Sequence, residues 1–145
     1  MPAKLISILA TVLLIVDATA LAFRGAILGT GPISWTLQAL GLALVAWARL
    51  TFGYRSFHFA ANPTEGGLIT SGPYHYVRNP IYAGAWVIIW IGAGTHLSIA
   101  NAALAIFAAA MLLARMFCEE QLLREIYPEY AGYAARTPRL IPFVI

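Results

Sequence analysis

Two stretches of the sequence hold most of the residues that could perform chemistry. The first is residues 66–82, which combine glycines and tyrosines with His75 and Arg78. Glycine lets the backbone approach a ligand closely, and tyrosine offers an aromatic face with a polar end. This stretch is therefore either a ligand-binding loop or a connector that its tyrosines anchor at a membrane surface.

The second stretch contains Arg115 and Glu119, followed directly by Glu120. Residues four apart share one face of a helix, and charged groups at the edge of an apolar helix mark function when they face the bundle interior. The carboxylate could bind the ammonium of an amino-acid-like ligand, and the guanidinium could hold an anionic group. The alternative is an ion pair at the membrane surface, which contributes little to stability.

The sequence lacks the residues that several other kinds of site require. The sequence has no glycine-rich dinucleotide motif and no P-loop, and its histidines lack metal-ligand spacing, so we expect no metal site. The only aspartate, Asp17, lies inside an apolar segment and is expected to be structural. The single cysteine, Cys118, permits no internal disulfide. Gln38 and Asn101 are expected to be polar contacts between helices.

Composition places the elements that carry these residues in a membrane. Of the 145 residues, 61% are hydrophobic and 10% are charged, whereas soluble domains average about 45–50% and about 25%. We therefore predict an all-α integral membrane bundle of about four transmembrane helices, formed as a single domain over residues 1–145. For the first helix, a retained span is favoured over a signal peptide. The expected spans are residues 5–23, 33–52, 81–93 and 97–118, the last two forming a hairpin.

Polar segments separate and follow these spans. The chain divides into two N-terminal spans, a polar loop, the hairpin and a C-terminal segment, over residues 1–52, 53–80, 81–118 and 119–145. We expect an amphipathic helix over residues 119–126 and an interruption at Pro128. A second short helix should carry Tyr130 and Tyr133.

The basic residues predict the orientation in the membrane. With four spans, both termini and the 53–80 loop lie on one side, and eight of the 9 basic residues lie there with them, leaving Arg24 opposite. Because positive charge favours the cytosolic side, we expect this side to be the cytosol, and the membrane to be the inner membrane if the chain is bacterial. The basic residues form no dense run, so no nucleic-acid partner is expected. A cytosolic cofactor and a membrane-dissolved substrate could meet at this face.

At these two stretches the sequence resembles the isoprenylcysteine carboxyl methyltransferases and the related phospholipid methyltransferases. The first motif is Thr70-Ser71-Gly72-Pro73-Tyr74-x-x-x-Arg78-Asn79-Pro80-x-Tyr82-x-Gly84. The second is Arg115-x-x-x-Glu119-Glu120-x-x-Leu123, followed by Tyr130-x-x-Tyr133-x-x-Arg136-x-Pro138. Both motifs occur in family order and with near-family spacing.

The resemblance implies methyl transfer from S-adenosylmethionine, which becomes S-adenosylhomocysteine, to a lipophilic acceptor from the bilayer. The expected acceptor is the carboxylate of a prenylcysteine-like molecule, which Arg115 would orient. Membrane lipids would surround the protein, and no obligate protein partner is evident. The residues that would bind the cofactor are Leu68, Ile69, Tyr74, Asn79, Pro80, Ile81, Tyr82 and Glu119.

The sequence also departs from the prenylcysteine enzymes. Asn79 stands where they usually have a histidine, and Gly66 stands where they can have another. Asparagine keeps hydrogen bonding but cannot take a histidine's acid–base role. Three other functions stay open: phospholipid amine N-methylation, in which His58 or His75 could assist deprotonation, an NADPH-dependent reductase of the sterol type, and a non-enzymatic membrane scaffold.

Overall fold

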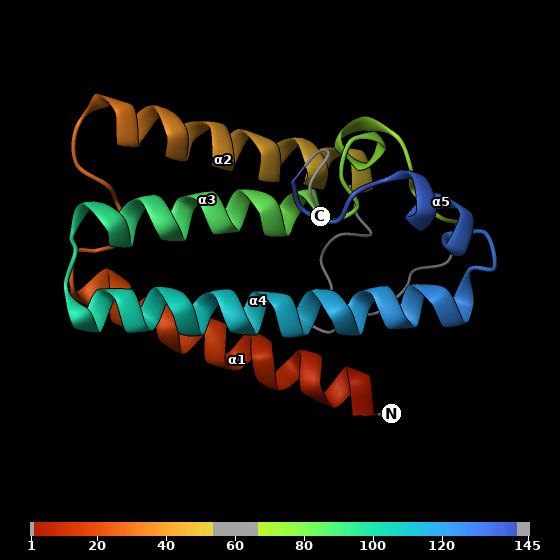
Figure 1. Cartoon of the computed structure of the whole chain (residues 1–145), viewed down its shortest axis with the longest axis horizontal. Coiled ribbons are helices and arrows are strands. Elements are labelled where there is room, and N and C mark those ends of the chain that lie inside the picture. Colours follow the sequence, from red (N-terminus) through yellow and green to blue (C-terminus); the bar gives the residue numbers. More distant parts are fainter. Residues whose placement is uncertain (1, 54–66, 142–145) are drawn as a thin grey trace.

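The computed structural model describes residues 2–53 and 67–141, and the regular structure in these ranges is entirely helical. Figure 1 shows the helices lying side by side along one long axis, with the shortest of them beyond one end. The prediction of an all-α membrane bundle is confirmed. The helices are α1 (Pro2–Phe23), α2 (Pro32–Phe52), α3 (Pro80–Thr95), α4 (Ile99–Ile126) and α5 (Tyr130–Arg136), with a short 3-10 turn, η2 (Gly72–His75).

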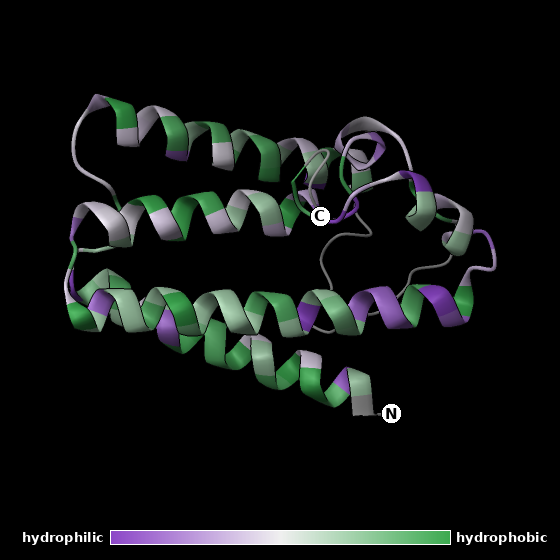
Figure 2. Cartoon of the chain, viewed as in Figure 1, coloured by the Kyte–Doolittle hydropathy of each residue, from purple (hydrophilic) through white to green (hydrophobic). Residues whose placement is uncertain are grey.

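Within the described residues, three helices are long and apolar enough to cross a membrane, over Ala3–Phe23, Pro32–Phe52 and Ile99–Ile126. The fourth expected span, α3, is apolar but has only 16 residues. At 1.5 Å per residue it reaches about 24 Å, against a hydrocarbon core of about 30 Å. Figure 2 shows hydrophobic residues along the bundle and hydrophilic ones gathered toward the α5 end.

The helices pack as two antiparallel pairs, α1 with α4 and α2 with α3, and α3 joins the pairs by packing on α4. Glycine sets the close approach of α2 and α3. A Cβ atom at Gly84 would lie 2.5 Å from the carbonyl oxygen of Gly41, and one at Gly41 would lie 3.0 Å from that of Gly84. Small residues at such contacts allow helices in membranes to approach closely.

The predicted roles of Gln38 and Asn101 as polar contacts between helices are confirmed. The Gln38 amide donates to the carbonyl oxygens of Ile27, at 2.7 Å, and Ile88, at 2.9 Å. Asn101 accepts a 2.5 Å hydrogen bond from Arg24 Nε. Both networks lie at the end of the bundle remote from α5. They hold the helices together at that end, and other residues determine the structure of the α5 end.

Two predicted boundaries are wrong. The expected break after Cys118 does not occur, because no glycine or proline interrupts the chain there and α4 continues as one helix to Ile126. Residues 119–126 are therefore the last turns of α4 and not a separate amphipathic helix. α3 runs to Thr95, two residues beyond the expected end at about residue 93. The short helix carrying the two tyrosines is confirmed as α5.

Candidate functional site

The polar residues converge where the start of α3, the last turns of α4, residues 67–79 and the tail at residues 137–141 come together. In Figure 1 this region lies at the α5 end of the bundle, and we call it the polar end. Pro80 can occupy the first turn of α3 because that position needs no backbone N–H. The turn therefore places Asn79 and Tyr82, the third residue of α3, beside α4.

Arg115 and Glu119 form an ion pair that other helices also contact. Arg115 Nε donates to Glu119 Oε1 at 3.2 Å and to the hydroxyl of Tyr82 at 2.9 Å. Its Nη1 donates to Thr11 of α1. The Arg115 side chain is 16% exposed and that of Glu119 is 28% exposed. The pair is thus partly buried among three helices, and it does not have the geometry of a surface ion pair.

Glu120, the neighbouring glutamate, sits in a separate and more deeply buried network. Its side chain is 4% exposed, and Oε2 accepts 3.2 Å contacts from Arg78 Nη1 and Arg139 Nε. Oε1 accepts a 2.9 Å hydrogen bond from the amide of Asn79. One carboxylate therefore joins α4 to the loop segment at residues 67–79 and to the tail.

The tail and α5 hold the loop segment against the bundle. The backbone N–H groups of Arg78 and Asn79 donate to the carbonyl oxygens of Pro138 and Arg139, at 2.8 and 3.0 Å. The hydroxyl of Tyr133 donates to the carbonyl oxygen of Tyr74 at 2.5 Å. These hydrogen bonds fix the backbone around η2, which in turn places the Tyr74 side chain.

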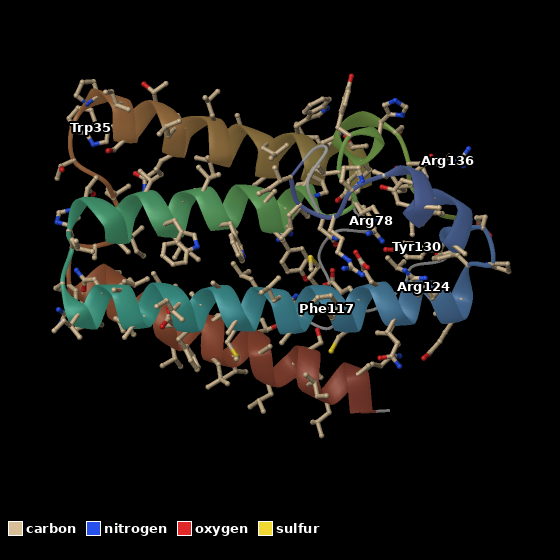
Figure 3. The ribbon with its side chains drawn as sticks, in the orientation of Figure 1. Trp35, Arg78, Phe117, Arg124, Tyr130 and Arg136 are labelled. Carbon is tan, nitrogen blue, oxygen red and sulfur yellow. The ribbon has the colours of Figure 1, made fainter. Side chains whose placement is uncertain are left out.

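Aromatic and cationic groups fill the space between α4 and α5. Figure 3 shows Arg78, Arg124 and Tyr130 gathered there. The guanidinium of Arg124 lies 5.5 Å from the centre of the Tyr130 ring, and Tyr130 is almost fully buried. Cations over aromatic faces attract one another, so this contact adds to the attachment of α5.

The buried tyrosines of this region stay protonated. Burial raises the pKa of Tyr74 far above the usual phenol range, and the negative charge of Glu119 raises it further while Arg49 lowers it. Burial also raises the pKa of Tyr133, as does the neighbouring Tyr130. These phenols are therefore hydrogen-bond donors at neutral pH, and they are poorly suited to act as general bases.

The structure brings together four of the predicted site residues and separates others from them. Arg115 contacts Tyr82 and Glu119 directly, and Tyr74 lies close enough to Glu119 for that charge to raise its pKa. Asn79 instead directs its amide to the buried Glu120. The remaining predicted residues lie at half-buried or buried positions of the same segment and the start of α3: Leu68, Ile69, Pro80 and Ile81.

The other candidates stand apart from this group. His75 is exposed and packs its ring edge-on against Tyr76, while His58 and Gly66 lie outside the described residues. Asp17 is buried, and its carboxylate oxygens have no hydrogen-bond partner within the described ranges. Among residues 2–53 and 67–141, no three histidine, cysteine or acidic side chains gather to hold a metal ion.

The sequence interpretation missed two residues of these networks: Thr11, which contacts Arg115, and Arg139, which contacts Glu120. Thr11 could have been noticed, since Ser7 and Thr11 are polar residues four apart within an apolar helix and so share a face. Arg139 gives no such local signal. It reaches Glu120 only because the tail folds back along the loop segment.

The fold and the charged groups define an integral membrane bundle with a polar site at one end. Residues 32–130 match the family model described as phospholipid methyltransferase. The match covers more than half of the chain, and the chain belongs to this family, whose domain is that of a membrane methyltransferase. α1 precedes the matched region, and most of α5 follows it.

Two curated bacterial proteins are similar to the chain. The cobalt-zinc-cadmium resistance protein CzcN of Cupriavidus metallidurans is 34% identical over 77% of this chain and 50% of its own length. The nickel-cobalt-cadmium resistance protein NccN of Alcaligenes xylosoxydans xylosoxydans is 40% identical over 52% of this chain and 36% of its own length. The chain thus spans half or less of these relatives. No solved structure matches it significantly.

Proposed function

We propose that this protein transfers a methyl group from S-adenosylmethionine to a lipophilic acceptor dissolved in the membrane. The observation that carries the proposal is the partly exposed Glu119, held by Arg115 beside Tyr74 and Tyr82 at the polar end. We further propose that the polar end and both termini face the cytosol, in agreement with the distribution of basic residues.

The donor set at Glu119 fits the amino-acid portion of S-adenosylmethionine. Arg115 occupies Oε1 of Glu119, and the carboxylate is exposed enough to accept an ammonium group. Charge-assisted hydrogen bonds of this kind are about twice as strong as neutral ones. Tyr74 and Phe52, whose ring centres are 5.8 Å apart, add an aromatic pair at the polar end. We therefore assign cofactor binding to Glu119 and Tyr74, with Tyr82 as a supporting contact.

When bound, the cofactor supplies an activated methyl group on a sulfonium, which leaves as a thioether. The protein must then bring the two substrates into line and keep water out. Arg115 is suited to hold the anionic group of the acceptor, because its planar guanidinium matches a carboxylate. An apolar cluster containing Tyr82, Leu112 and Met116 adjoins the arginine and provides the dry surroundings.

A carboxylate acceptor fits this site better than an amine. A carboxylate is already ionised at neutral pH, whereas an amine must first lose a proton. The phenol of Tyr74 keeps its own proton at neutral pH, because burial raises its pKa and the charge of Glu119 raises it further. We therefore favour a prenylcysteine-like carboxylate as the acceptor. The family description keeps a phospholipid amine as the second candidate.

Ligand binding to the full chain in detergent tests the proposal. Calorimetry should show that S-adenosylmethionine and S-adenosylhomocysteine bind and that NADPH does not. Glu119→Gln should weaken this binding roughly 10- to 100-fold, since it removes a charge-assisted contact. The matched control is Glu125→Gln, an exposed glutamate of α4 that contacts Gln121, and it should bind like the wild type.

Transfer of a labelled methyl group then separates the acceptors. We expect a prenylcysteine analogue to be methylated and phosphatidylethanolamine to remain unlabelled. Labelling of phosphatidylethanolamine alone would move the assignment to the amine. Absence of adenosyl-ligand binding, or equal binding by the Glu119 variant and the wild type, would overturn the site.

A further inference from the structure

Thr11 of α1 contacts the guanidinium of Arg115 as an oriented acceptor. Arg115 Nη1 donates to Thr11 Oγ1, while Thr11 donates its own proton to the carbonyl oxygen of Ser7 at 2.8 Å. A hydroxyl has one proton and two lone pairs. With the proton engaged along α1, the lone pairs are directed outward from the helix to the arginine.

The packing of α1 on α4 makes this contact a consequence of helix register. Ala3 packs with Leu122 near one end of the pair, and Arg24 bonds to Asn101 near the other. The antiparallel register between these points brings Thr11 within about one turn of the site arginine. Side chains on a helix lean toward its N-terminus, so the arginine reaches back along α4 to Thr11.

Fixing two corners of a guanidinium fixes its plane. Arg115 Nε is bound to Tyr82 and Glu119, and Nη1 is bound to Thr11. Because the group is planar and rigid, these contacts set the direction of its N–H bonds. Without the Thr11 contact, Nε would still be bound to Tyr82 and Glu119. The plane of the guanidinium could then turn about Nε, because Nη1 would no longer be held.

We propose that Thr11 is a positioning residue that orients Arg115 toward the methyl acceptor, so that α1 completes the acceptor end of the site. This inference rests on the proposed function. It goes beyond that function because α1 lies outside the region that matches the family model. Acceptor orientation would then depend on a helix that this region does not include.

Steady-state kinetics with matched variants tests the proposal. Thr11→Val keeps the shape of the side chain and removes the hydroxyl, whereas Thr11→Ser keeps the hydroxyl. Thr19→Val is the control, since Thr19 also donates to a carbonyl four residues earlier, at 2.7 Å, but is exposed about two turns further along α1. All three variants alter the same helix in similar ways.

We expect Thr11→Val to raise the KM for the prenylcysteine analogue roughly tenfold, as for a lost hydrogen bond to a charged group. Its affinity for S-adenosylhomocysteine should stay within about twofold of the wild type. Thr11→Ser and Thr19→Val should resemble the wild type. An unchanged KM in Thr11→Val, or an equal defect in Thr11→Ser, would overturn the proposal. An equal loss of cofactor affinity would indicate general damage and would also overturn it.

A double-mutant cycle separates this inference from the proposed function. Thermal unfolding in detergent is measured for Thr11→Val, Arg115→Gln and the double variant. Non-additive effects are expected if the two side chains interact, and additive effects would refute the contact. If the wild-type protein transfers no methyl group, the proposed function is refuted, and the proposed role of Thr11 in acceptor orientation is refuted with it. The cycle tests only the contact between Thr11 and Arg115, so the two failures can be told apart.

Discussion

Glu120→Gln should destabilise the protein far more than Glu119→Gln, although the two glutamates are adjacent in the sequence. Glu120 is the carboxylate that compensates Arg78, whose side chain is only 8% exposed. Removing one partner of a buried ion pair costs about 3–5 kcal/mol, because the other charge stays buried without compensation. Arg139 is 35% exposed and remains hydrated, so it adds about 1 kcal/mol or less.

The glutamine side chain keeps part of the network. It can still accept the hydrogen bond from Asn79 and one from an arginine, which places the expected loss near the lower limit, at about 3 kcal/mol. For a chain of this size that loss corresponds to a fall in Tm of roughly 10 °C. Glu119→Gln removes a contact from a pair that is less buried than Glu120 and Arg78, and it leaves Arg115 bound to Tyr82 and Thr11. Its cost should be about 1 kcal/mol.

Tryptophan fluorescence during thermal unfolding in detergent measures both variants, since the chain has 4 tryptophans. Binding of S-adenosylhomocysteine well below the Tm supplies the second measurement. Glu120→Gln should lower Tm by roughly 10 °C and, where folded, retain measurable binding, whereas Glu119→Gln should lower Tm by only about 3 °C and weaken binding roughly 10- to 100-fold. Equal Tm losses in the two variants, or a larger loss in Glu119→Gln, would refute the division of roles between the two glutamates.

Two further predictions concern packing and titration. Gly84→Ala should cost about 1–3 kcal/mol through overpacking against Gly41, whereas Gly94→Ala on the same helix meets open space and should stabilise by up to about 1 kcal/mol; equal Tm shifts would contradict the close helix approach. Because burial raises the pKa of Tyr74 and Tyr133 in the folded state, their contribution to stability is fully present below the unfolded phenol pKa of about 10 and is lost as pH rises through the folded values. Phenolate absorbance at pH 11 should therefore grow on unfolding, and Tyr74→Phe should reduce that increase, while an unchanged increase would show that Tyr74 ionises in the folded protein.

The sequence was sufficient for the helices whose limits are set locally. Apolar runs bounded by Phe23 and Pro32 predicted α1 and the start of α2, and Pro128 correctly separated α4 from α5. The break after Cys118 was wrong because composition changes there while helix propensity does not. A change from apolar to charged residues marks where a helix leaves an apolar environment, and it does not by itself end the helix.

The proximity of Arg115 and Glu119 was predictable from the sequence, but the arrangement of the groups around them was not. The motif containing Arg115 and Glu119 identified a pair that the structure confirms as neighbours. Consecutive residues of a helix point about 100° apart, so Glu119 and Glu120 had to face different surroundings. Which of the two faces the interior depends on where the tail and α1 pack, and these are contacts between segments distant in the sequence.

The buried Glu120 network orders polar segments at the polar end, where few apolar contacts are present to do so. Residues 67–79 and the tail lie at the polar end, beyond most of the apolar helix surface. Few apolar side chains are therefore available there to order these segments by hydrophobic burial. Backbone hydrogen bonds between the two segments satisfy some of their polar groups, and the charge of Glu120 gathers Arg78 and Arg139 around one point. These contacts also hold the segment that carries Tyr74, whose carbonyl oxygen accepts from Tyr133. Under the proposed function the two adjacent glutamates have separate tasks: Glu119 stays partly exposed to bind the cofactor, and Glu120 is the buried partner that holds the loop segment in place.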